Sequence, residues 1–77
     1  MKLPKGWKLK KENGKQIVYE SEKYQIIIWK KRGDYLVETF RKSPTYKARL
    51  FAQSFLKLRE AKKFAVDIMG RDKIRKY

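Results

Sequence analysis

Apolar and polar residues alternate along the first half of the chain in short segments, and turn-forming residues separate these segments. Residues 7–11 alternate apolar and basic side chains, and Asn13-Gly14 directly after them is a strong signal for a tight hairpin turn. Residues 24–29 are dense in β-branched and aromatic side chains, which is typical of a strand buried on both faces. Two further turns are predicted at Ser21-Glu22 and at Arg32-Gly33. The pattern therefore predicts an antiparallel meander of four strands between about residues 7 and 41.

The spacing of apolar residues changes to a helical period in the second half of the chain. Ser43-Pro44 is typical of a helix N-terminus, with serine as the N-cap and proline at the first helical position. Residues 46–65 contain no Gly, Pro, Val, Ile or Thr, and Gly70 stands where a glycine often ends a helix. We therefore predict one long C-terminal helix over about residues 44–69. The resulting fold class is α+β, a four-stranded antiparallel β-meander followed by a helix (ββββα).

An alternative for the same stretch makes residues 47–54 a fifth strand, which a shorter helix would follow. The alanines at positions 48 and 52 and the lack of β-branched residues favour the long helix. The long helix is therefore the prediction, and the fifth strand stays open as its alternative.

The predicted turns assign every strand residue to one of two sheet faces, because residues directly opposite on paired strands share a face. One face is mostly apolar and is predicted to pack against the helix: Trp7, Leu9, Val18, Gln25, Ile27, Trp29, Leu36, Glu38 and Phe40. The other face interleaves tyrosines, aliphatic residues and cations, and is predicted to face solvent: Lys8, Lys10, Ile17, Tyr19, Tyr24, Ile26, Ile28, Tyr35, Val37, Thr39 and Arg41. A slip of one residue at any turn would exchange the two sets.

The charge of the chain narrows the class of partner. The 77 residues include 22 Lys plus Arg and 8 Asp plus Glu, which gives a formal net charge of +14. A surplus of this size in a small domain attracts nucleic acid, an anionic membrane or an acidic protein. A charged thermophilic surface is a simpler explanation, but thermophilic proteins usually gain Glu together with Lys. Nucleic acid is therefore the predicted partner.

The tyrosine-bearing face suits single-stranded nucleic acid, because unpaired bases stack on aromatic rings while cations neutralise the phosphates. Trp29 near a strand end, the basic turn at residues 30–32 and the basic tail at 71–77 extend this surface. Tyrosines are also common strand residues that simply pack against Ile and Val. The predicted nucleic-acid-binding residues are Lys8, Lys10, Tyr19, Tyr24, Trp29, Lys30, Lys31, Arg32, Tyr35 and Arg41.

The length of the predicted helix suggests a contact between chains. A helix of about 26 residues is roughly 39 Å long, whereas a seven-residue strand is about 23 Å long. Such a helix overhangs its sheet, and its wide apolar arc leaves an edge for a second chain. We therefore predict a homo-oligomer, a dimer or a tetramer. Its predicted interface consists of Tyr46, Leu50, Phe51, Phe55, Leu58, Phe64 and Ile68.

The composition of the chain does not favour an enzyme. The chain has no His and no Cys, which removes the commonest general base, the thiol nucleophile and the preferred zinc ligands. The carboxylates lack metal-ligand spacing, and the glycines form no phosphate-binding loop. We predict a non-enzyme with no metal and no cofactor. Neither a secretory signal nor an apolar run near the roughly 20 residues of a membrane span is present, so we expect one cytoplasmic domain without a membrane partner.

The chain from Trp7 to Gly70 resembles small single-stranded-DNA-binding domains in its order of elements and its charge. These are the transcriptional positive-cofactor type and the ThermoDBP-related proteins of thermophilic archaea. In this resemblance residues 24–41 form the central hairpin and residues 43–69 the helix, and no diagnostic motif carries it. It implies binding of single strands with little sequence preference by an oligomer. An RNA-binding or ribosome-associated module remains an alternative, as does a transcription regulator that binds a partner protein through the apolar helix edge.

Overall fold

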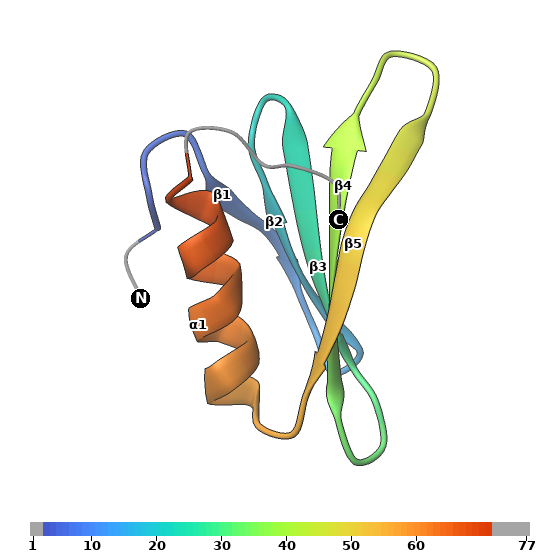
Figure 1. Cartoon of the computed structure of the whole chain (residues 1–77), viewed down its shortest axis with the longest axis vertical. Coiled ribbons are helices and arrows are strands. Elements are labelled where there is room, and N and C mark those ends of the chain that lie inside the picture. Colours follow the sequence, from blue (N-terminus) through green and yellow to red (C-terminus); the bar gives the residue numbers. More distant parts are fainter. Residues whose placement is uncertain (1–2, 72–77) are drawn as a thin grey trace.

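A computed structural model of the protein describes residues 3–71. Five strands form one sheet in the order β1-β2-β3-β4-β5, every neighbouring pair is antiparallel, and helix α1 follows at the C-terminal end (Figure 1). The elements are β1 (Lys8–Glu12), β2 (Gln16–Glu20), β3 (Tyr24–Lys30), β4 (Tyr35–Lys42), β5 (Lys47–Phe55) and α1 (Leu58–Met69). The α+β class and the antiparallel meander are confirmed. The predicted basic tail lies outside the described residues except for Arg71.

The three turns predicted from the sequence all fall between strands. At the first of them, the Asn13 side-chain oxygen accepts hydrogen bonds from the backbone N–H groups of Lys15 at 2.8 Å and Gln16 at 2.9 Å. At the third, Gly33 has a φ of +90°, a conformation that a side chain would disfavour. Local turn chemistry therefore sets the ends of β1 to β4.

The predicted long helix is wrong, because residues 47–55 form the fifth strand. This strand pairs with β4 from Lys42 opposite Lys47 to Tyr35 opposite Phe55. Ser43-Pro44 lies in the β4–β5 hairpin, where the Ser43 N–H donates to the Tyr46 carbonyl at 2.9 Å, and it does not start a helix. Helix propensity is a weak preference, and pairing along a whole strand outweighs it by satisfying the backbone groups of the β4 edge. The alternative with a fifth strand and a shorter helix is the one observed.

Helix α1 covers one face of the sheet and leaves the other uncovered (Figure 1). It packs against β3, β4 and β5. Its residues Ala61, Ala65 and Ile68 are each 0% exposed, and the small alanines allow the helix to approach the strands closely. At the margin of this contact Phe64 packs against Phe51 and Phe55, with ring centroids 6.2 and 5.0 Å apart. In the described residues, no helix is long and apolar enough to span a membrane.

The helix covers the sheet face that the sequence pattern assigned to solvent. Two rows of opposed residues cross the sheet beneath it: Leu9, Tyr19, Ile26, Thr39 and Phe51, then Glu12, Ile17, Ile28, Val37 and Gln53. Ile26, Ile28 and Val37 in these rows are 0% exposed. The pairing of β2, β3 and β4 therefore follows the predicted sets, but the assignment of those sets to helix and solvent is reversed. The reason is that both sets are apolar enough to form a core, and the aliphatic set fits closely against the alanines of α1.

A bulge in β1 changes the faces of the residues near the N-terminus. The register shifts between Leu9 and Lys11, so that Leu9 lies opposite Tyr19 and Lys8 lies opposite Glu20. The uninterrupted alternation predicted that Lys8 and Lys10 share a face with the tyrosines. The bulge places both lysines on the opposite face. Leu9 moves to the helix side instead. A bulge inserts one extra residue into a strand, and alternation in the sequence does not reveal it.

Candidate nucleic-acid interface

The sheet face away from α1 carries cations, aromatic rings and two carboxylates, and we call it the open face. Three rows of opposed residues cross it: Lys8, Glu20, Gln25, Phe40 and Arg49; Lys11, Val18, Ile27, Glu38 and Ala52; and Gln16, Trp29, Leu36 and Ser54. Lys10 at the bulge and the opposed pair Lys42 and Lys47 complete it. Val18 and Ile27 are only 5% and 7% exposed, so long polar side chains cover the apolar floor of this face.

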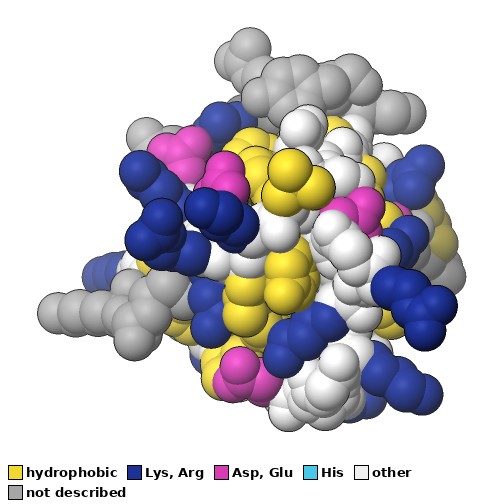
Figure 2. All heavy atoms as spheres, turned by 90° about the horizontal axis from the view of Figure 1, so that it is seen from below, with side chains coloured by type: hydrophobic (Ala, Val, Ile, Leu, Met, Phe, Trp, Pro, Cys, Tyr) yellow, Lys and Arg dark blue, Asp and Glu magenta, His cyan; other side chains and the backbone are white. Residues whose placement is uncertain are grey.

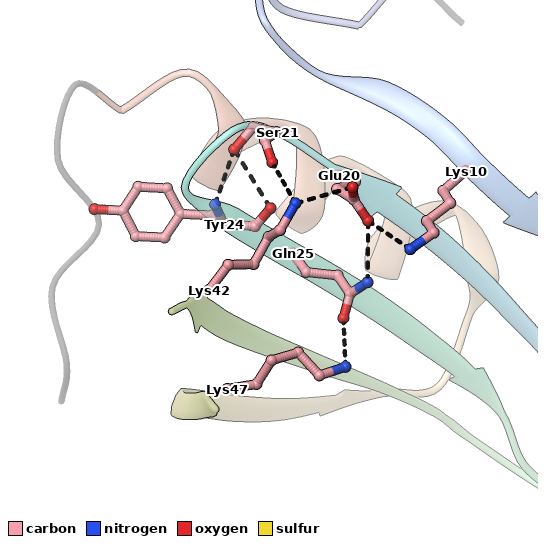
Figure 3. A network of polar contacts seen from close by, with 7 residues as sticks. All are labelled: Lys10, Glu20, Ser21, Tyr24, Gln25, Lys42 and Lys47. Atoms are coloured by element: carbon pink, nitrogen blue, oxygen red, sulfur yellow. Dashed lines mark hydrogen bonds and ion pairs between the residues drawn. The ribbon is translucent and has the colours of Figure 1, made fainter. Parts of the chain in front are cut away.

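A chain of polar contacts joins three lysines on the open face (Figure 3). The Glu20 carboxylate binds the Nζ atoms of Lys10 and Lys42, each at 2.9 Å. The Gln25 side chain donates to Glu20 Oε2 at 3.4 Å and accepts from Lys47 Nζ at 2.9 Å. Cations from β1 and β4 therefore converge on Glu20 at the end of β2, and the cation at the start of β5 joins them through Gln25 of β3.

The two aromatic rings of the open face are each held by a neighbour. The Trp29 indole N–H donates to Glu38 Oε1, and the other oxygen of Glu38 accepts from Arg49 at 3.3 Å. Lys47 Nζ lies 5.4 Å from the centroid of the Phe40 ring, a cation–π distance. Both rings are half-buried; Phe40 lies beside a cation, and Trp29 shares the Glu38 carboxylate with one.

The surroundings of Glu20 change its titration. Hydrogen bonds from Lys10 and then from Lys42 lower the pKa of Glu20 from 4.5 to about 2, while burial acts in the opposite direction. A carboxyl whose pKa is lower in the folded than in the unfolded chain stabilises the fold above its unfolded pKa. This stabilisation is lost as the pH falls from about 4.5 to about 2.

We expect this loss to be measurable as a difference between the wild type and Glu20→Gln. Urea denaturation of both proteins should show the wild type more stable above pH ~5, with the difference vanishing towards pH ~2. Taking the difference between the two proteins removes the titration of the other carboxyls. A difference that stays constant over this range would contradict the lowered pKa.

The structure separates the residues predicted to bind nucleic acid. Lys8, Lys10 and Trp29 lie on the open face. Lys30, Lys31 and Arg32 lie at the β3–β4 end of the sheet. Tyr19, Tyr24, Tyr35 and Arg41 belong to rows on the helix side.

The three tyrosines predicted to form a stacking platform do not lie together on the open face. Tyr19 is 3% exposed, and its burial raises the pKa of its hydroxyl, with a further contribution from the Glu12 carboxylate. Tyr24 and Tyr35 are half-buried and pack against the same core. The reason is the reversed assignment of the two faces, since these side chains lie on the side that α1 covers.

The sequence pattern missed part of the open face. The sequence pattern predicts Phe40 and Gln25 on the face beneath the helix. It places Lys42 on neither face, and Lys47 and Arg49 in the helix itself. The alternation of Lys47 and Arg49 with Ala48 and Leu50 is the signal that could have placed them on one face of a strand. Beside them a hollow at the β4–β5 hairpin is lined by Arg41, Lys42, Ser43, Pro44, Tyr46 and Ala48, with Tyr46 65% exposed.

Most residues of the predicted oligomer interface are used within the protomer. Ile68 is 0% exposed, and five others are half-buried against the same core: Leu50, Phe51, Phe55, Leu58 and Phe64. The overhang that motivated the interface is also absent, because α1 has 12 residues. The apolar arc is wide because it includes residues of a strand. Oligomer formation stays a prediction without this structural basis.

Exposed cations lie on both sides of the sheet, with Lys8 and Arg49 on the open face and Arg59 and Lys63 on α1. Viewed from the end that holds the β5–α1 connection, Lys and Arg side chains surround a central group of hydrophobic side chains, with few acidic ones between them (Figure 2). Charge alone therefore does not single out one surface. The open face is distinguished by the combination of cations with Trp29 and Phe40 on a sheet surface that α1 does not cover.

Within residues 3–71, no cluster of three or more His, Cys, Asp or Glu side chains has the arrangement of a metal site. Comparisons of the chain with family models, with curated proteins and with solved structures find no match. The resemblance to single-stranded-DNA-binding domains therefore stays a prediction from the order of elements and the charge.

Proposed function

We propose that the protein is a non-catalytic nucleic-acid-binding protein that binds unpaired strands on its open face with little base preference. DNA is the form that the resemblance in architecture implies. The observation that carries the proposal is the combination of cations and aromatic rings on the uncovered side of the sheet. Lys10, Lys42 and Lys47 gather around Glu20, Gln25 and Phe40, and further along this face Arg49 and Trp29 both contact Glu38.

This combination suits an unpaired strand because its two components bind different parts of it. Aromatic rings stack on bases, at about 1–3 kcal/mol per base, and every base has a face that stacks. Cations bind the phosphates whatever the sequence. The contact of Trp29 with Glu38 holds the indole ring in place before binding, which lowers the entropy lost when a base stacks on it.

The width of the sheet favours an unpaired strand over a duplex. Five strands spaced about 4.8 Å apart are roughly 19 Å across. The major groove of B-DNA is about 12 Å wide and admits a helix or a two-stranded ribbon. A duplex also hides the base faces that Trp29 and Phe40 would stack on.

Titration of labelled oligonucleotides tests the proposal. Single-stranded DNA, the matching RNA and the matching duplex are titrated with protein at several salt concentrations between about 50 and 300 mM. We expect single strands to bind more tightly than duplex, and log K to fall linearly with log salt by about 0.7 per phosphate contact. Absence of binding at about 50 mM salt would overturn the function, and preference for duplex would overturn stacking on the open face. The RNA titration decides between DNA and RNA as the favoured strand.

A further inference from the structure

We propose that Lys10, Lys42 and Lys47 form one phosphate position on the path of the bound strand, and that Glu20 occupies this position in the free protein as an internal competitor. The inference rests on the proposed function and deepens it. In this proposal the three lysines strengthen the binding of the strand, whereas the Glu20 carboxylate weakens it.

The first argument is the geometry around Glu20. Its two carboxylate oxygens contact different lysines, Oε2 with Lys10 and Oε1 with Lys42, each at 2.9 Å (Figure 3). A backbone phosphate also presents two anionic oxygens, and lysine binds it as a point charge. The carboxylate therefore already makes the contacts that a phosphate would make.

The second argument is that the lysines are held from more than one side. Lys42 Nζ also donates to the Ser21 carbonyl at 3.2 Å, and Lys47 Nζ donates to Gln25 at 2.9 Å. These contacts do not involve the Glu20 carboxylate. They keep the two ammonium groups near their places when the carboxylate turns away.

The third argument is access from solvent. The side chains of Lys10 and Lys42 are 54% and 32% exposed, whereas that of Glu20 is 16% exposed. A phosphate that approaches the open face therefore meets the lysines first. It forms new ion pairs from outside, while the Glu20 carboxylate loses its own.

Glu20 acts in opposite directions on the stability of the free protein and on the affinity for a strand. In the free protein Glu20 offsets the repulsion between neighbouring cations, so it stabilises the fold. In the complex each ion pair that Glu20 retains is one that the phosphate lacks, so Glu20 weakens binding. Glu20→Gln should therefore lower the stability of the free protein and raise its affinity for a single strand. A purely structural role would lower stability without raising affinity.

The matched control is Glu22→Gln, which changes the net charge by the same amount two residues away. Glu22 is exposed and forms no ion pair within the part of the chain that the structure describes. At about 100 mM salt we expect Glu20→Gln to bind a single-stranded oligonucleotide about three- to tenfold more tightly than the wild type. Glu22→Gln should change the affinity less than about twofold, because only the long-range field differs. Thermal denaturation without nucleic acid should give a lower midpoint for Glu20→Gln than for Glu22→Gln.

The outcomes separate the two proposals. If the wild type binds and Glu20→Gln binds no more tightly than Glu22→Gln, the competitor is disproved while the proposed function stands. If neither the wild type nor either variant binds any strand, the function fails, and the competitor with it. Should Glu20→Gln not fold, Glu20→Asp tests the same point, because its shorter carboxylate reaches both lysines less well. A gain in affinity for Glu20→Asp supports the inference, and an unchanged or lower affinity overturns it.

Discussion

Replacing Lys42, Lys47 and Arg49 together by alanine should weaken binding of single-stranded DNA by about 25-fold at 0.1 M salt. Lys42 and Lys47 serve one phosphate position and Arg49 a second, and each phosphate contact contributes about 0.7 to the slope of log K against log salt, so the slope falls by about 1.4. At 0.1 M salt this change in slope corresponds to about 1.4 powers of ten in affinity. The three cations lie together on β4 and β5 of the open face, where they contact Glu20, Gln25 and Glu38.

A second triple variant distinguishes a local surface from the general positive field. Lys57, Arg59 and Lys63 are exposed side chains at the start and along the outer side of α1. Replacing them by alanine removes the same charge from the other side of the sheet. We expect this variant to lose less than about fivefold in affinity with nearly the same salt slope, since screening limits the field beyond about 10 Å. Equal losses in the two triple variants would show that the open face is not the binding surface.

The second large effect concerns stability. Ile68→Ala should lower the free energy of unfolding by about 2–4 kcal/mol, because a fully buried isoleucine leaves a cavity when it is truncated. Ile68 is 0% exposed and packs in the core between α1 and the sheet. In a small domain whose total stability is about 5–15 kcal/mol, this is a large share. Urea denaturation followed by tryptophan fluorescence measures it.

The control for Ile68 lies two residues away. Val66 is half-buried on the outer side of the same helix, and Val66→Ala should change the unfolding free energy by less than about 1 kcal/mol.

Denaturation of Ile68→Ala at two protein concentrations distinguishes a core residue from a residue at an interface between chains. A core position gives the same loss at both concentrations. If the loss depends on concentration while light scattering shows a shift from oligomer to monomer, Ile68 lies at an interface between chains and its placement in the core is wrong.

The turns and the pairing of the first strands were readable from local chemistry. Asn13 closes its turn with its own side chain, and Gly33 supplies a positive φ, so both act within a few residues. Once these turns are placed, the register of β2, β3 and β4 follows, as in the opposition of Val18 with Ile27. The sets of residues that share a face were therefore predictable over this part of the sheet. The bulge at Lys10 was not, because no local signal distinguishes it from regular alternation.

Two features depended on contacts between distant residues. Residues 47–55 have no strong preference between helix and strand, and the decision came from the open edge of β4, which pairs with them along its whole length. The face that α1 covers was undecided as well, because Tyr19, Ile26 and Val37 on one side and Val18, Ile27 and Trp29 on the other are similarly apolar. That choice moved the candidate interface from the tyrosines to Trp29, Phe40 and the cations of β4 and β5.

By itself the sequence determined the charge, the absence of His and Cys, the turns, and the residues that share a face in the central strands. These properties depend on composition or on neighbours a few residues apart. Only the tertiary structure decided that a fifth strand replaces the first part of the predicted helix, which face α1 covers, and how Lys10, Lys42 and Lys47 gather around Glu20 and Gln25. The physical reason is that each of these results from packing or pairing between segments far apart in the chain, where local preferences are nearly balanced.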